Sequence, residues 1–382
     1  MHAPLRRLLA FLLVAVPASV PGFAGVTWGA APLQAEGPRP AHDLVLSELP
    51  SQRAVEDRAE SAVVLVVLDG VRWQDVYEGA DRALLGPRAG PSAAPSGPRA
   101  LLPNLYRLLD AHGVALGAPG HGPEIAATGP QYISLPGYLE IFSGHADSRC
   151  LSNFCGRAPG RTLVDDVRES SGGAEVGVVT SWPTIARAAA ADPSGVVLTA
   201  GRRVTDRADL LRADEPTAAL LDQGARASAW PGEDDYRPDA LTGRIALRYL
   251  VAAHPRFLFV GLGDADELAH RNDYRGYLGA LRASDAFIGG LLDALATMGA
   301  RGRHTTVVVT TDHGRAYGFR DHGPFHPESG RVWLIAGNGD THGGGLAVAS
   351  RRHTLSDVAP TVRALLGITG GEGEPIPEIV AR

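Results

Sequence analysis

The stretch from Thr305 to Gly314 reads TTVVVTTDHG, and the fold expected for the chain follows from it. Its run of β-branched residues, bounded by polar and glycine positions, predicts a buried strand, and Asp312 and His313 stand where that strand ends. In an open α/β sheet the carboxyl ends of the strands face the ligand crevice. An adjacent Asp and His at this position are therefore well placed to hold a metal ion.

Two further apolar strands end in the same kind of residue. Ser61 to Leu68 (SAVVLVVL) leads into Asp69, and Phe257 to Leu262 (FLFVGL) leads into Asp266, with His270 one helical turn later. Three strands that lie far apart in the sequence thus each deliver an acid at the C-terminal end. This pattern predicts one convergent site, which we interpret as a two-metal hydrolase centre.

The order of the elements predicts an α/β fold, with a mostly parallel central sheet and helices on both faces. Helical apolar spacing at 101–112 follows the first strand, and strand-helix pairs follow at 176–191 and 257–298. Residues 81–98, rich in Gly, Pro, Ala and Arg, are typical of a surface loop.

The composition limits the number of domains and the classes of function that the chain can have. The chain has 382 residues, 45% hydrophobic and 20% charged, which fits one large domain with at most a modest insertion. The formal charge of -6 gives no indication of nucleic-acid binding. All 36 basic residues are Arg, so a Schiff-base lysine and the lysine of a phosphate-binding P-loop are both excluded.

Residues 1–31 predict a signal peptide. Arg6 and Arg7 precede an apolar core, Leu8 to Val16, that is too short to span a bilayer, and we expect cleavage between residues 18 and 31. An uncleaved membrane anchor is the alternative. We therefore expect an exported protein, periplasmic or secreted, with no stable membrane span after cleavage.

The remaining chain divides into an irregular N-terminal arm, 32–58, and a catalytic domain, 59–382. Within the domain, residues 191–255 contain two helical patterns, which fit either a helical insertion or ordinary crossover helices; we take the second interpretation. Cys150 and Cys155 are the only cysteines. In an exported protein we expect them to form a small disulfide loop.

Ser134 is the candidate nucleophile, in the segment QYISLPGYLEIFSGH. It precedes Leu135 and Pro136, and a helix that begins at the proline would bring the hydroxyl near free backbone N–H groups. A serine held there by a metal ion can attack a tetrahedral phosphorus. The alternative is a plain N-cap serine, the common use of Ser before a helix.

Taken together, these segments resemble the alkaline phosphatase superfamily, which includes phosphodiesterases, sulfatases and cofactor-independent phosphoglycerate mutases. The resemblance covers most of residues 59–367. The segments that carry it, in chain order, are LVVLDGVRW, LPNLYRLLDAHGVAL, SLPGYLEIFSG, DADELAH, TTDHG and HTLSDVAPTVRALLGI. Their shared order and spacing favour common descent over chance.

The resemblance implies two divalent metal ions and a ligand set for each. Mixed carboxylate and imidazole ligands suit Zn²⁺ best, with Mn²⁺ or Fe as alternatives. One ion would be bound by Asp69, Asp312, His313 and the oxygen of Ser134, and the other by Asp266, His270 and a later histidine.

The later histidine has two candidates. His322 and His326 both precede an apolar strand at 332–336; relatives in which an HG pair precedes such a strand favour His322, and His326 is the alternative. Asp264 could replace Asp266, but only Asp266 has the i, i+4 relation to His270. Four further acids and histidines are treated as structural: Asp75, His121, His145 and His342.

The sequence also departs from better-known relatives. Formylglycine sulfatases need Arg four positions after the modified residue, where this chain has Tyr138, so we expect Ser134 to stay a serine. Nucleotide pyrophosphatase-like members usually carry Asn three positions after the nucleophile, where this chain has Gly137. The oxyanion contacts are therefore left open, with the backbone N–H of Leu135 and the side chain of Arg315 as candidates.

We therefore expect an exported two-metal hydrolase that cleaves phosphate or phosphonate esters of small molecules through a phosphoseryl intermediate at Ser134. A sulfatase-like enzyme, a transferase of phospho groups and a non-catalytic binding protein that keeps the fold are the alternatives. The sequence indicates neither the natural substrate nor the oligomeric state.

Overall fold

The computed structural model describes residues 61–86, 97–171, 176–206 and 208–380. The predicted signal peptide, the N-terminal arm and the middle of the predicted 81–98 loop lie outside the described residues. None of the described helices combines the length and the apolar character that crossing a membrane requires.

A large sheet forms the centre of the described residues. Five neighbouring strands, β8, β1, β7, β4 and β5, run parallel, whereas β10 and the edge strand β6 run antiparallel to their neighbours. This arrangement confirms the predicted α/β fold with a mostly parallel sheet. Across the described residues the sheet has nine strands, in the order β11 (Gly345–Leu346), β2 (Val114–Leu116), β10 (Leu334–Gly337), β8 (Thr305–Thr310), β1 (Ala62–Leu68), β7 (Phe257–Leu262), β4 (Val176–Thr180), β5 (Val197–Ala200) and β6 (Arg203–Asp206).

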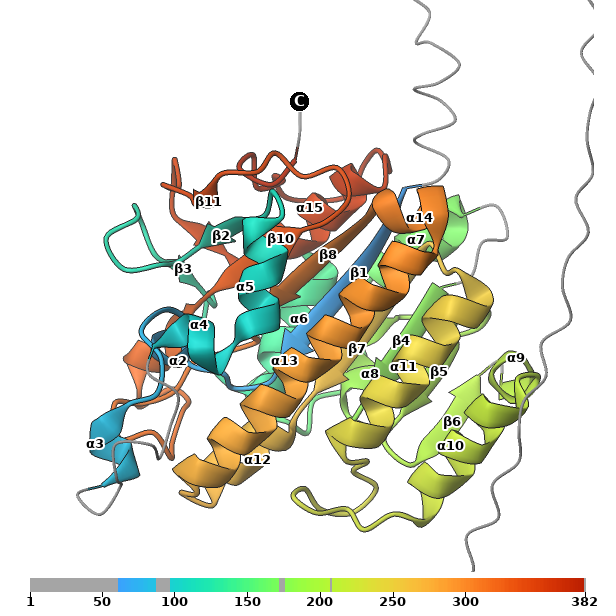
Figure 1. Ribbon diagram of the computed structural model, residues 1–382, viewed down its shortest axis with the longest axis horizontal. Helices are drawn as coiled ribbons and strands as arrows, with labels where there is room; N and C mark the ends of the chain where they lie inside the picture. Colours follow the sequence, from blue (N-terminus) through green and yellow to red (C-terminus); the bar gives the residue numbers. More distant parts are fainter. Residues whose placement is uncertain (1–60, 87–96, 172–175, 207, 381–382) are drawn as a thin grey trace, which may run out of the picture. The chain divides into compact units, whose positions relative to one another are not determined.

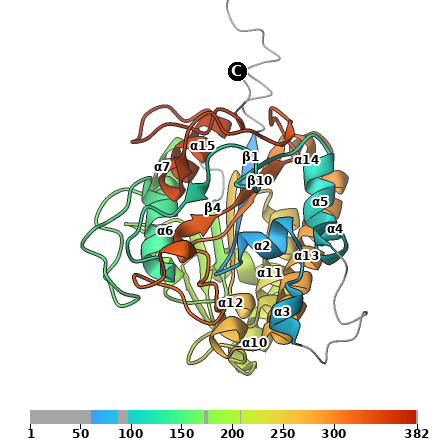
Figure 2. The same ribbon diagram turned by 90° about the vertical axis from the view of Figure 1, so that its left-hand side faces the viewer.

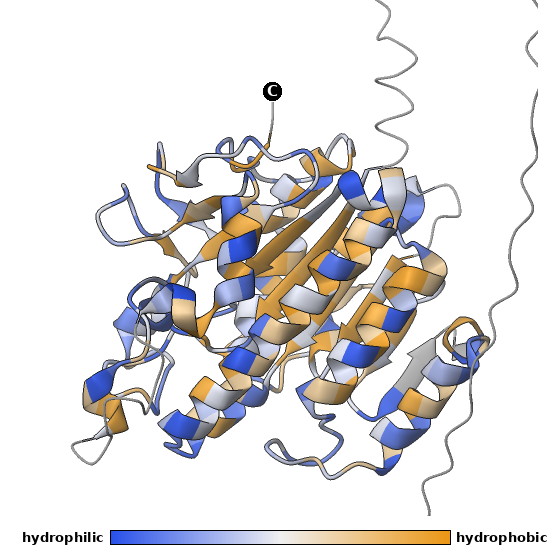
Figure 3. Ribbon diagram, in the orientation of Figure 1, coloured by the Kyte–Doolittle hydropathy of each residue, from blue (hydrophilic) through white to orange (hydrophobic). Residues whose placement is uncertain are grey.

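The central strands are apolar on both sides because both sides are covered. In β1, Val63 and Leu65 belong to one apolar layer, whereas Val64 and Val66 belong to the opposite layer. Figure 3 shows the central strands as nearly continuous apolar segments between helices of mixed character. A parallel sheet with two covered faces requires this pattern, which is why Val-rich runs predicted it.

Helices form a layer on each face of the sheet (Figures 1 and 2). Buried side chains of α6, α7, α8 and α15 belong to the layer of Val63, and those of α5, α11 and α13 belong to the layer of Val64. The helices are α2 (Trp73–Tyr77), α3 (Arg82–Leu85), α4 (Pro98–Leu101), α5 (Pro103–Asp110), α6 (Ser134–Ser143), α7 (Leu163–Ser170), α8 (Ile185–Ala189), α9 (Ala208–Arg212), α10 (Glu215–Arg226), α11 (Asp239–Ala253), α12 (Asp264–His270), α13 (Tyr274–Thr297), α14 (Gly299–Arg303) and α15 (Val358–Leu365).

Two predicted elements are each divided in the structure. The helix predicted at 101–112 is two helices, because the backbone leaves the helical region at Leu102 and α5 starts at Pro103. The strand predicted at 332–336 divides at Trp333 into β9 (Arg331–Val332) and β10. β9 belongs to a second, small sheet with β3 (Ile125–Ala126) and β12 (His353–Thr354).

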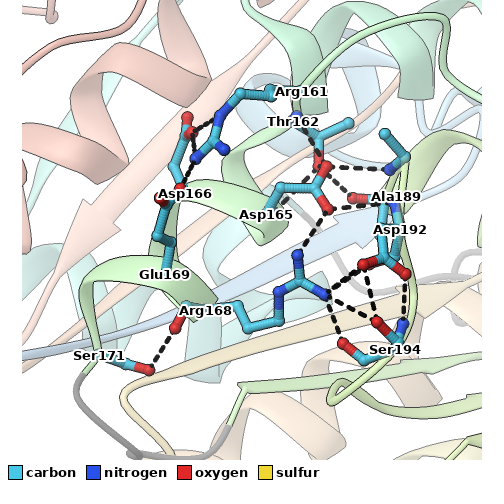
Figure 4. Close-up of polar contacts among 12 residues, drawn as sticks. Arg161, Thr162, Asp165, Asp166, Arg168, Glu169, Ser171, Ala189, Asp192 and Ser194 are labelled. Atoms are coloured by element: carbon cyan, nitrogen blue, oxygen red, sulfur yellow. Dashed lines mark hydrogen bonds and ion pairs between the residues drawn. The ribbon is translucent and has the colours of Figure 1, made fainter.

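Residues 191–255 widen the central sheet. The two predicted helices are present as α10 and α11, but the segment also contributes β5 and β6, which the sequence analysis missed. The connection that leads into β5 is fixed to α7 (Figure 4): the carboxylate of Asp165 accepts hydrogen bonds from the backbone N–H groups of Ala191 and Asp192. Thr162 and Asp165 also form a capping box at the start of α7.

Candidate metal centre and nucleophile

The candidate residues lie together at the C-terminal edge of the central sheet. Asp69 follows β1, Asp266 lies on α12 directly after β7, and Asp312 and His313 follow β8. β1 pairs in parallel with both β7 and β8, in a register that brings the ends of the three strands side by side. The convergence expected of the three strand ends is therefore present in the fold.

Ser134 lies in the first turn of α6 with its hydroxyl directed into this cluster. Its Oγ is 3.2 Å from Oδ1 of Asp69 and 3.2 Å from Nε2 of His313. The N-cap of α6 is Ile133, so α6 begins two residues before the proline, and Ser134 is not the N-cap serine of the alternative interpretation. The hydroxyl is buried and contacts Asp69 and His313 of the cluster rather than the backbone N–H groups of the helix terminus.

His313 presents a ring nitrogen with a lone pair to the cluster. Its Nδ1 lies 2.8 Å from the carbonyl oxygen of Gly314, which can only accept, so Nδ1 carries the proton and Nε2 does not. Nε2 lies 3.5 Å from Oδ1 of Asp69 and 3.5 Å from Oδ2 of Asp312. This tautomer is the one that binds a metal ion through Nε2.

A second group of candidate ligands lies on α12 and the loop after β8. Oδ2 of Asp266 is 3.0 Å from Nε2 of His270, and Nε2 of His322 is 3.1 Å from the same nitrogen. Nδ1 of His322 donates to the carbonyl of Tyr132 at 2.9 Å, which leaves its Nε2 with a lone pair. The structure thus places His322 in the cluster, whereas the nearest charged partner of His326 is Glu328, at 3.9 Å.

Three carboxylates crowd together in this buried site. Burial, with the neighbouring Asp266 carboxylate, raises the pKa of Asp69 to about 7. Burial and the Asp69 carboxylate raise the pKa of Asp312 well above its usual range. Burial also opposes the charge of Asp266, but the Arg315 guanidinium holds the pKa of that carboxyl well below its usual range. Burial and mutual repulsion therefore disfavour the charged forms of Asp69 and Asp312, and a bound divalent cation would favour them.

The histidines are electrostatically suited to be ligands. Burial lowers the pKa of His313 to about 4 and that of His322 to about 3, so both rings are neutral at physiological pH. The third ring is that of His270. The paired carboxylate of Asp266 raises the pKa of this ring. Neutral imidazole is the metal-binding form.

The residues present fit the binding of divalent cations. Oδ2 of Asp312 is buried and has no hydrogen-bond partner, as expected of an oxygen that has another role. Carboxylate oxygen and imidazole nitrogen are the donor types that Zn²⁺ takes in catalytic sites. Ligand atoms within 4.8 Å of one another form two groups that share Asp266: Asp266, His270 and His322, and Asp69, Asp266 and His313.

Both of the expected oxyanion donors already donate hydrogen bonds to other groups of the protein. The backbone N–H of Leu135 donates to Oδ1 of Asn153 at 2.9 Å. The buried Arg315 guanidinium donates to the carbonyls of Phe319 and Arg320 and pairs with Asp266. Arg315 therefore holds the Asp266 carboxylate and the loop that follows Arg315 itself.

Asn153 is the residue that the sequence analysis missed. Ile133 cannot cap α6 with its side chain, and Asn153 supplies the acceptor from the loop closed by Cys150 and Cys155. The disulfide between these cysteines is present, as predicted. Only the nearness of this loop to the candidate nucleophile in the sequence could have drawn attention to Asn153.

The other acids near the strand ends have structural partners. Asp264 accepts hydrogen bonds from the hydroxyl of Tyr236 and the backbone N–H of Asp239, and its own N–H donates to Asp239, so that α11 and α12 cap each other. Asp75 is buried in an ion pair with Arg72. Neither acid belongs to the two ligand groups, and the same holds for the histidines set aside as structural: His121, His145 and His342.

Comparisons with known proteins bear on the family and the fold. A family model described as the Metalloenzyme superfamily matches residues 240–369, which contain Asp266, His270, Asp312, His313 and His322. A crystal structure of the alkaline phosphatase PafA is similar, with 12% sequence identity and a TM-score of 0.52. The matched region covers 84% of this chain and 99% of the PafA chain. The match to the Metalloenzyme superfamily covers about a third of the chain, and the likeness to PafA is one of fold. The resemblance seen in the sequence is thereby confirmed.

Two further solved structures share the fold with similar TM-scores. The phosphonate monoester hydrolase of Agrobacterium radiobacter has 16% identity and a TM-score of 0.52, with 84% of this chain and 77% of that chain covered. A protein crystallised in complex with its substrate D-glucosamine-2-N,6-O-disulfate has 12% identity and a TM-score of 0.55, with 84% and 80% covered. A search of the curated proteins found no match.

Proposed function

We propose that the chain is a metal-dependent hydrolase of phosphate or phosphonate esters with Ser134 as its nucleophile. The observation that carries this proposal is the position of the Ser134 hydroxyl, 3.2 Å from both Asp69 and His313 in a buried cluster of acids and histidines. A serine with only a structural role would have no need of this position, because α6 is capped by another residue.

The metal ligands divide between two adjacent positions. Zn²⁺ is the cation that we expect, and two such ions would supply the charge that lowers the pKa of a serine hydroxyl and stabilises the transferring group. Asp266 lies between the positions and is shared by both groups of close ligand atoms. The proposed sets are Asp69, Asp312, His313 and Ser134 for one ion, and Asp266, His270 and His322 for the other.

The protein's own groups orient the attack. Asp69 and His313 fix the Ser134 oxygen, and the dipole of α6 favours an anionic group at this end of the helix. The amide of Asn153 accepts the Leu135 N–H with its oxygen, so its NH₂ group carries donors that can reach a phosphoryl oxygen at the same helix end. Asn153 thereby takes the place of the Asn that the motif lacks at Gly137.

Phosphoryl rather than sulfuryl esters are the expected substrates. The transferring oxygens of a phosphoryl group carry more negative charge than those of a sulfate monoester, so a site with two divalent cations favours the phosphoryl group. The chain also lacks the lysines that sulfatase-like sites pair with a single metal.

The test compares kcat/KM for an aryl phosphate and the matching aryl sulfate on one metal-replete preparation. We expect the phosphate to be the better substrate, and Ser134→Ala to lose at least about a thousandfold in kcat with its metal content and fold retained. Equal or higher efficiency on the sulfate would move the chain to the sulfatase branch. A near-normal rate in Ser134→Ala would remove Ser134 from the mechanism.

Export is part of the same proposal. It is supported by the signal-like composition of residues 1–31 and by the disulfide between Cys150 and Cys155, since disulfides persist in oxidising compartments. Intact-mass measurement of protein recovered from the producing cells, fraction by fraction, would show whether the first 18–31 residues are removed.

A further inference from the structure

Four large aromatic side chains stand exposed on the described part of the chain. Their exposed fractions are 90% for Phe154, 90% for Phe325, 78% for Tyr317 and 59% for Trp230. Exposed aromatic rings are costly to keep in water, and loops held by a rigid scaffold are where binding residues concentrate. The position of each ring relative to the candidate site is therefore informative.

Phe154 is anchored beside the nucleophile. The residue before it, Asn153, accepts the backbone N–H of Leu135, which directly follows Ser134. The disulfide that closes the loop and a hydrogen bond from the Phe154 N–H to Ser152 fix the backbone here. The ring is thus exposed at a fixed position, not at the tip of a long loop.

Phe325 is anchored close to the residue that precedes the nucleophile. It follows His322 by three residues and lies in a turn in which the N–H of His326 donates to the carbonyl of Gly323. Gly323 packs against Ile133, where an added Cβ would lie 3.4 Å from Cγ2. Ile133 directly precedes Ser134, so the two phenylalanine loops rest on the two chain neighbours of the nucleophile.

Trp230 stacks on the residue that follows His270 of the second ligand group. The guanidinium of Arg271 lies 4.6 Å from the centre of the Trp230 ring and donates to the carbonyl of Pro231. Arg271 directly follows His270, and Figure 1 shows the segment between α10 and α11 at the same edge of the sheet as α12. The stacked cation holds the Trp230 ring in place.

Tyr317 completes this set of rings. It lies two residues after Arg315, which pairs with Asp266, and its backbone N–H donates to Glu328. Phe154, Phe325 and Tyr317 therefore lie within three residues of Asn153, His322 and Arg315, and Trp230 stacks on the residue that follows His270. The other large apolar side chains that are exposed among the described residues are aliphatic: Leu151, Val251, Leu346 and Val348.

We propose that Phe154, Phe325, Tyr317 and Trp230 form an aromatic rim that binds an apolar group of the substrate. The proposal rests on the proposed function and names its substrate class: phosphate or phosphonate esters whose alcohol or second substituent carries an aryl or alkyl body. In this proposal the reacting group enters the charged cluster, and the apolar body of the ester lies against these rings. Burial against aromatic faces gives affinity without polar partners.

The experiment uses p-nitrophenyl phosphodiesters that share one leaving group and differ in the second substituent: methyl, phenyl or hexyl. On the metal-replete full chain, kcat/KM should rise at least about tenfold from methyl to phenyl and to hexyl, because each buried methylene equivalent contributes about fourfold in affinity. The double variant Phe154→Ser/Phe325→Ser should bring these ratios close to one. Val348→Ser, which changes another exposed apolar residue, near β11, should leave the ratios at the wild-type value.

The outcomes separate the two proposals. Turnover of all three diesters at equal efficiency would overturn the aromatic rim and leave the hydrolase proposal standing, whereas absence of turnover of every ester would overturn the hydrolase proposal itself. Sedimentation with phosphatidylcholine vesicles provides a further arm. Vesicle binding that the double variant abolishes, combined with equal diester efficiencies, would assign the rings to a membrane surface and overturn the substrate-binding role.

Discussion

Asn153→Ala removes the acceptor of the Leu135 backbone N–H, a hydrogen bond of 2.9 Å. Helix α6 starts after Ile133, whose side chain makes no cap, so Asn153 caps the helix from a distant position in the chain. Loss of a side-chain cap costs about 1 kcal/mol, within a range of about 0.5–2 kcal/mol. We expect the free energy of unfolding of the variant to fall by about this amount, and kcat to fall because Ser134 stands in the same helical turn.

The disulfide provides a way to test how Asn153 is held. In the chain-entropy picture, closing a loop of about six residues stabilises the folded state by about 2 kcal/mol. If the loop has no other role, replacing both Cys150 and Cys155 with Ser should lower the free energy of unfolding by this amount. Because the loop also positions Asn153, the two changes act on one contact, and the triple variant should lose less than the sum of about 3 kcal/mol.

Equilibrium unfolding in urea measures all three variants. Arg149→Ala is the matched control, since its exposed side chain lies in the same segment and pairs with Asp147; we expect its stability to stay within about 0.5 kcal/mol of wild type. An Asn153→Ala variant with unchanged stability and kcat would show that the cap does not matter. Strict additivity in the triple variant would show that the disulfide does not hold Asn153.

Three further predictions follow from single contacts. Asp312→Ala should lose metal and activity together, because it removes a buried carboxylate whose Oδ2 has no other partner; a full metal complement by elemental analysis would contradict the assignment. Gly137→Ala should lower the melting temperature, because an added Cβ would lie 2.4 Å from the carbonyl oxygen of Asp312; an unchanged melting temperature would refute this. Burial opposes the charge of Asp357, but hydrogen bonds from His353 and Arg351 lower the pKa of that carboxyl below its ordinary value of 3.8. A lowered folded pKa gives stability that is present above the unfolded pKa and lost as the pH falls through the folded one. Asp357→Asn should therefore weaken the acid-induced loss of stability, and unfolding measured between pH 2 and 6 would show no difference if the contact is unimportant.

The parts of the fold that could be predicted are those in which neighbouring residues carry the signal. The three strands that end in Asp69, Asp266 and Asp312 are continuous apolar runs, and each acid comes within a few residues of its strand. The rule that parallel strands present their carboxyl ends at one edge then brings the acids together without any tertiary information. His322 required the family resemblance, because no local pattern separates it from His326.

The parts that could not be predicted depend on contacts between segments. β5 and β6 have four residues each, too few for periodicity to distinguish them from loop, and they become strands because β4 offers β5 a free edge. The sharing of Asp266 between both ligand groups depends on a spacing between strand ends that no local sequence contains. Asn153 is the extreme case, because an asparagine in a short loop has many possible partners.

The start of α6 shows how such a contact bears on function. The side-chain oxygen of a serine at the N-terminus of a helix normally accepts a hydrogen bond from a free backbone N–H group. In this chain the cap is supplied by Asn153, and Ile133 occupies the N-cap position, so the oxygen of Ser134 is not needed by the helix. Its hydroxyl can then face Asp69 and His313. The local sequence around Ser134 is compatible with both arrangements, and the loop bearing Asn153 decides between them.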